Sequence, residues 1–189
     1  MIEHEEQKNQ SAEKSIIESL KAQVAGGWGS SIQRGSEATL LMIEMIERRE
    51  TSGNPMVLMG DFNNTLADGV LSHLLTNTLR FVSSIDRDAY LTKYCLHDAW
   101  DLFEVAKINE AETDQFEKLE RTPTHYFGAG SSVLDYILLS CEFDASYHDS
   151  LYQVCNHNTY DRHLINPIFE RDGESTDHGI VSVTLTLRC

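Results

Sequence analysis

The chain has 189 residues, of which 41% are hydrophobic, a length and composition that suit one globular domain with a sizeable core. Thirty acidic residues against fifteen basic ones give a formal charge of −15; this disfavours an extended nucleic-acid footprint and suits a site that concentrates divalent cations. Because no apolar run approaches the roughly 20 residues of a membrane span and the start does not resemble a signal peptide, we expect a soluble chain, most simply cytoplasmic.

The first fifty residues predict an arm and then a helix. Residues 1–14 are polar and read as a frayed arm, while residues 15–24 are ambiguous between strand and helix. The glycine-rich "GGWGSS" predicts a break. After it, residues 33–50 carry apolar side chains at helical spacing, which predicts a helix that ends before "TSGNP".

The next segment, Val57 to Leu66, reads "VLMGDFNNTL" and places an apolar run directly before polar turn residues. Residues 56–59 predict a short buried strand that ends in a turn at residues 60–64. Two short helices are expected over residues 66–77 and 97–107, followed by an exposed acidic connector.

Three β-rich stretches dominate the remainder of the chain. They are "TPTHYF" (122–127), "VLDYILLS" (133–140) and "GIVSVTLTL" (179–187). The intervening residues 147–175 suggest one strand and then a long polar loop. Helices interspersed with strands predict a layered α/β domain.

Polar residues gather at three of these strands: in "GDFN", at Asp135 inside "VLDYILLS", and at Asp177-His178 before the last strand. An Asx turn alone explains Asp61 and Asn63. Asp135 is harder to explain, because a carboxylate in a buried strand is costly unless it is paired. His178 is the candidate partner, since a carboxylate orients an imidazole and raises its basicity.

At these motifs the chain resembles the endonuclease/exonuclease/phosphatase superfamily, metal-dependent phosphoesterases that include DNase I-like nucleases, sphingomyelinases and inositol polyphosphate phosphatases. The resemblance rests on "GDFN", "LDYILLS" and "STDHGIV" in the family's order, with "RGSEATLLMIEMI" similar to the helix before the first motif. "SLKAQ" also resembles a His-Leu-Lys-Ser strand of the family, with Ser19 at the histidine position. The resemblance implies a DNase I-like, four-layered α/β/β/α sandwich.

The resemblance also implies roles for individual residues. Asp61 would orient or deprotonate the attacking water, and Asn63 would hold that water or a phosphate oxygen. Asp135 would pair with His178, which stabilises the transition state. Asp177, together with Asp61, would bind the divalent metal, Mg²⁺ or Mn²⁺. These roles agree with what phosphoester hydrolysis needs, a positioned nucleophile and positive charge beside the phosphate.

The chain departs from the family in its first part. The family's first half supplies an asparagine and a metal-binding glutamate, and neither is recognisable here. We therefore interpret residues 15–189 as a C-terminal portion of the domain, preceded by the arm of residues 1–14. We expect the isolated chain to bind metal weakly, to be largely inactive and to self-associate or take a partner.

Several alternatives stay open. His125 contacts substrate or is a solvated loop histidine, and Arg34 reaches a phosphate or is a surface charge. A catalytically silent binding domain of the same fold is the main alternative to an enzyme; an unrelated α/β binding module is a weaker one. The substrate is a phosphoester, with nucleic acid, phospholipid and inositol phosphate undecided.

Overall fold

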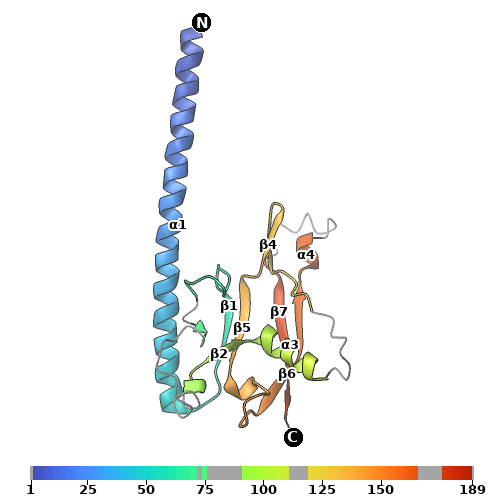
Figure 1. Ribbon diagram of the computed structural model, residues 1–189. Coiled ribbons are helices and arrows are strands. Elements are labelled where there is room, and N and C mark those ends of the chain that lie inside the picture. Colours follow the sequence, from blue (N-terminus) through green and yellow to red (C-terminus); the bar gives the residue numbers. More distant parts are fainter. Residues whose placement is uncertain (1, 72–73, 76–90, 111–118, 166–175, 189) are drawn as a thin grey trace.

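The computed structural model describes residues 2–71, 74–75, 91–110, 119–165 and 176–188. Its helices and strands, in chain order, are α1 (Ile2–Ser52), β1 (Val57–Asp61), β2 (Leu96–Asp98), α3 (Ala99–Glu110), β3 (His125–Phe127), β4 (Gly130–Ser132), β5 (Asp135–Ser140), η3 (Cys141–Phe143), β6 (Tyr152–Tyr160), α4 (Arg162–Ile165) and β7 (Ile180–Leu187). Figure 1 shows α1 as a long rod whose first half projects beyond the body. Among the described residues no helix has the length and apolar character needed to cross a membrane.

Helix α1 is continuous, so the predicted break at "GGWGSS" is wrong, as is the strand alternative for residues 15–24. A Cβ atom added at Gly26, Gly27 or Gly29 would meet nothing within 4 Å, which shows that this stretch stands free of the body. Each glycine costs a helix about 1 kcal/mol relative to alanine. Helix-forming residues on both sides carry the helix through, because propagation is far easier than nucleation.

The last turns of α1 join the helix to the body. Ala38 and Met42 are buried in a cluster with Tyr136 and Leu138 of β5. Arg49, with its side chain 6% exposed, forms an ion pair with Glu142 and donates to the carbonyl groups that follow the helix. The final third of α1 therefore belongs to the folded body.

Strands β1, β5 and β2 form an antiparallel sheet in that order, with β5 at the centre. Strand β1 is present as predicted but is not buried, because it lies at the sheet edge and one of its faces is uncovered: Val57 is 44% and Met59 65% exposed. Its register with β5 places Asp61 opposite Asp135. Residues directly opposite each other in a ladder share a face, so both carboxylates lie on the face turned away from α1.

The other face of β5 contacts α3 and the two-stranded sheet of β6 and β7. Figure 1 shows β1 and β5 between α1 and this second sheet. The hairpin of β3 and β4 is joined to the start of β7 by a bridge between His125 and His178.

Most predicted elements are present. The helix expected over 97–107 is α3, and the three β-rich stretches contain β3, β5 and β7. Residues 66–71 form turns rather than the expected helix, and the acidic connector and the long polar loop fall largely outside the described residues. Mixed helices and small antiparallel sheets agree with the α/β class; the four-layered sandwich stays a prediction.

Candidate active site

The "GDFN" motif forms the turn at the end of β1. The Asp61 Oδ1 atom accepts a hydrogen bond from the backbone N–H of Asn63 at 2.7 Å, which is an Asx turn. Asn63 has φ 51°, a left-handed conformation that asparagine tolerates better than most residues. The second oxygen, Oδ2, lies 4.0 Å from Nε2 of His178. Asp61 therefore both closes the turn and faces the imidazole.

Asp135 and His178 form the closest pair in the site. The Oδ2 atom of Asp135 lies 2.8 Å from Nδ1 of His178, and the two side chains are 18% and 21% exposed. Because Nδ1 is committed to Asp135, the Nε2 atom is left to face Asp61. The carboxylate thereby fixes both the orientation of the ring and the nitrogen that is available for chemistry.

The β3–β4 hairpin holds His178 in place. The backbone N–H of Gly179 donates to the carbonyl oxygen of Thr124 at 2.6 Å. A Cβ atom at Gly179 would come within 3.3 Å of the Thr124 backbone, so this approach requires glycine or a local shift. Nε2 of His163 lies 3.0 Å from the carbonyl oxygen of His178 and donates to it in the tautomer that carries a hydrogen on Nε2.

Sequence reasoning missed Thr124 and His163. The Thr124 side chain is buried, and its Oγ1 accepts from the backbone N–H groups of Leu134 and Asp135 at 2.9 and 3.2 Å. It thereby fixes the start of β5, where Asp135 begins the strand. Neither residue carries a local signal, because both act through contacts that only the folded chain creates.

Acidic neighbours raise the pKa of His178. The hydrogen bond with Asp135 raises the pKa of the imidazole above its ordinary value of 6.5, partial burial lowers it, and the charges of Asp135, Asp61 and Asp177 raise it further. The net direction is upward. The site therefore favours an imidazolium, which is a positive charge surrounded by three carboxylates.

Two further predicted residues flank the same imidazole. The ring of His125 lies 5.2 Å from that of His178, centroid to centroid. Asp177 is exposed and lies beside both histidines. Five of the predicted residues thus gather around one ring: Asp61, His125, Asp135, Asp177 and His178.

The remaining two predicted residues, Asn63 and Arg34, line a pocket of about 450 Å³ that adjoins this cluster. The pocket lies between α1 and the end of β1, and Asp61 forms part of its wall. Asp61 is thus a residue of both, with its carboxylate on the face of the sheet that is turned away from α1.

The donor atoms in the cluster are compatible with a divalent cation. Among the described residues two groups of three have ligand atoms within 4.8 Å of one another: Asp61, Asp135 and His178, and His125, Asp177 and His178. The predicted ligands Asp61 and Asp177 fall into different groups, which share His178. Carboxylates that are open to water suit Mg²⁺, which keeps several water ligands, whereas imidazole nitrogen is a poorer ligand for it.

A comparison with protein-family models matches residues 28–149 to the endonuclease/exonuclease/phosphatase family. The matched range covers more than half of the chain and includes Arg34, Asp61, Asn63, His125 and Asp135; Asp177 and His178 lie beyond it. The comparisons with curated proteins and with solved structures found no match.

Proposed function

The chain belongs to the endonuclease/exonuclease/phosphatase family, and on that premise we propose that it carries the catalytic residues of a metal-dependent phosphoesterase. The proposed reaction is hydrolysis of a phosphodiester or a phosphomonoester. The observation that carries the proposal is the line of Asp135, His178 and Asp61, in which a carboxylate orients an imidazole toward a second carboxylate.

Each residue has a role that its contacts support. Asp61 faces His178 with one oxygen and takes the proton of the attacking water, whose oxygen bonds to phosphorus as the ester bond breaks. Imidazolium His178 donates from Nε2 to a non-bridging phosphate oxygen, where negative charge increases. Asp135 keeps that ring oriented and charged. Asn63 holds the water or a phosphate oxygen, and solvent protonates the departing alkoxide.

The proposed metal is Mg²⁺ or Mn²⁺, held by Asp61 and Asp177. When bound, the ion supplies positive charge next to the phosphate. Because these carboxylates belong to separate ligand groups, we expect weak metal affinity from this chain by itself.

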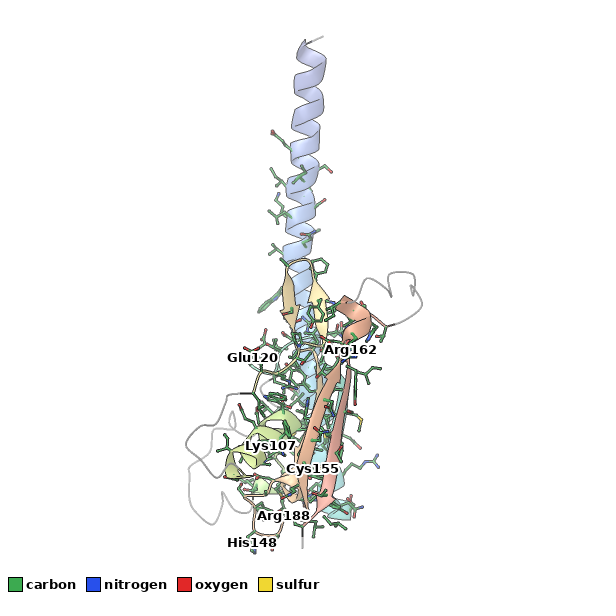
Figure 2. All side chains as sticks on the ribbon, turned by 90° about the vertical axis from the view of Figure 1, so that its right-hand side faces the viewer. Lys107, Glu120, His148, Cys155, Arg162 and Arg188 are labelled. Atoms are coloured by element: carbon green, nitrogen blue, oxygen red, sulfur yellow. The ribbon has the colours of Figure 1, made fainter. Side chains whose placement is uncertain are left out.

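The test measures turnover of bis(4-nitrophenyl) phosphate and 4-nitrophenyl phosphate with excess Mg²⁺ or Mn²⁺ and with chelator. His178→Gln should lower turnover about a hundredfold or more, since it removes the charge that stabilises the transition state. A matched control is His148→Gln: His148 also contacts an aspartate, at 2.8 Å, but is 83% exposed. Figure 2 places it at the end of the body opposite Arg162 of α4.

A second readout serves if turnover is low. Inorganic phosphate, added in the presence of Mg²⁺ and without Mn²⁺, should shift the NMR signals of the His178 imidazole. The signals of His148 should stay unchanged. Absence of both His178-dependent turnover and this shift contradicts the proposal and favours a catalytically silent binding domain.

A further inference from the structure

Arg34, which lines the pocket beside Asp61, has one guanidinium nitrogen without a hydrogen-bond partner among the described residues. Arg34 projects from α1 into the pocket wall, and its Nε atom is buried with no hydrogen-bond acceptor among the described residues. An unsatisfied buried donor is destabilising, and more so when it is charged. The Arg34 side chain as a whole is only partly buried, so an anion bound in the pocket can pair with its charge.

Within the part of the chain that the structure describes, Glu37 and Asp68 do not neutralise Arg34. Glu37 also lines the pocket, but it is exposed and its carboxylate accepts from the Gln33 side chain at 2.9 Å. Asp68 interacts with Arg34 only as the last of several effects that lower the pKa of Asp68, and it is fully exposed. Solvent screens such interactions strongly. The guanidinium therefore remains available to a bound anion.

The rest of the pocket is suited to an apolar group. Its wall includes Ala38, Leu41, Leu58, Phe62, Leu71 and Leu74. A volume of about 450 Å³ lies within the range of sites that bind small organic molecules. Asp61, Asn63 and Arg34 line the same pocket as these apolar side chains.

We propose that this pocket binds the alcohol part of the phosphoester, and that Arg34 holds a second anionic group on it. The substrate class is thus an organic phosphoester with an apolar body and a second anionic group, a carboxylate or a further phosphate. The planar guanidinium matches either anion with two parallel hydrogen bonds. This inference rests on the proposed function for the placement of the scissile phosphate at Asp61 and His178.

Binding of non-hydrolysable phosphonates tests the pocket independently of catalysis. The probes are phenyl- and biphenylphosphonates, each with and without a terminal carboxylate, titrated by calorimetry. The terminal carboxylate should lower the dissociation constant of the phenyl- or the biphenylphosphonate about tenfold or more. A change of this size is expected from a charge-assisted hydrogen bond. Arg34→Gln should abolish that difference, and Arg34→Lys should restore it only in part.

The matched control is Arg48→Gln, on the same helix but outside the pocket and 79% exposed in its side chain. It should leave the carboxylate preference unchanged. Absence of any carboxylate preference, or a preference that Arg34→Gln leaves intact, overturns the inference. A carboxylate preference that depends on Arg34 supports the inference about the pocket even if His178→Gln has no effect on turnover. The two experiments therefore distinguish failure of the proposed function from failure of the pocket inference.

Discussion

At the scale of single residues, Asp61 shows that turn chemistry and site chemistry are compatible. One oxygen closes the Asx turn with Asn63, and the other faces His178. The turn therefore sets the direction in which the free oxygen points. A motif that looks like ordinary turn chemistry can thus be the means by which a carboxylate is positioned.

We predict that Asp135→Asn lowers the pKa of His178 toward 6.5, because a neutral amide replaces the carboxylate whose hydrogen bond and charge raise that pKa. In the folded chain the pKa of His178 is higher than its unfolded-state value, near 6.5. The Asp135–His178 pair therefore stabilises the fold fully at pH values below the unfolded-state pKa. This stabilisation is lost as pH rises through the folded-state pKa. NMR titration of the imidazole, with unfolding at several pH values, measures both effects.

Asp61→Asn is the comparison, since Asp61 acts only by charge from 4.0 Å. It should lower the pKa of His178 by less than Asp135→Asn does. Equal shifts in the two variants contradict the assignment of Asp135 as the orienting partner.

A second prediction at this scale concerns Thr124, whose hydroxyl accepts two backbone N–H groups. Thr124→Val leaves these donors unsatisfied in a buried place and should lower the free energy of unfolding by about 1–3 kcal/mol. Thr124→Ser keeps the hydroxyl and should lower the free energy of unfolding by less than Thr124→Val does. Chemical denaturation measures the free energy of unfolding of both variants. Equal decreases in the two variants would contradict a role for the hydroxyl hydrogen bonds.

At the scale of elements, α1 shows how far local signals can mislead. Three glycines and two serines in "GGWGSS" resemble a linker, yet the helix continues through them. Gly53, at the end of the same helix, has φ 64° and donates from its N–H to the Arg49 carbonyl. The glycine that ends the helix is the one in the left-handed conformation.

The same substitution should therefore have opposite effects at two places in this element. Gly26→Ala adds a methyl group to open space and should stabilise the helix by about 1 kcal/mol. Gly53→Ala places a Cβ atom on a residue with positive φ and should destabilise the fold by a similar amount. Far-UV circular dichroism during thermal unfolding measures both. Absence of any stabilisation in Gly26→Ala would contradict a helical conformation for this segment.

At the scale of the whole molecule, the face of α1 that joins the body continues beyond it. Ile17 and Val24 precede Ala38 at multiples of seven residues, which return a helix to nearly the same side. Ala38 is buried, whereas Ile17 and Val24 are 51% and 68% exposed. Trp28, at 69%, extends the same stripe. The apolar face is thus covered at one end of the helix only.

We propose that this stripe promotes self-association, because a contiguous exposed apolar patch favours burial against another surface. The double variant Val24→Lys, Trp28→Lys should lower the mass measured by light scattering toward that of a monomer. Leu40→Lys is the control, since Leu40 is 66% exposed but lies on the other side of the helix. A monomeric unsubstituted chain, or an equal effect of both variants, contradicts the proposal.

Much of the site could be predicted from the sequence because its signals are local. Alternation and turn residues located the strands at Val57, Asp135 and Ile180, and the cost of an unpaired carboxylate in a strand suggested His178 as the partner of Asp135. The exposure of β1 could not be predicted, because an apolar run does not reveal whether its strand is central or at an edge.

The sequence by itself determined the types and order of the chemically active residues, since these follow from short patterns and from the family that the patterns indicate. Only the tertiary structure decided which atoms meet: β1–β5 register sets Asp61 opposite Asp135, and the β3–β4 hairpin brings His178 within 2.8 Å of that carboxylate. It also decided that α1 is one helix and that Thr124 fixes the start of β5. The reason is that local periodicity fixes an element's shape, whereas register and docking depend on contacts between residues far apart in the chain.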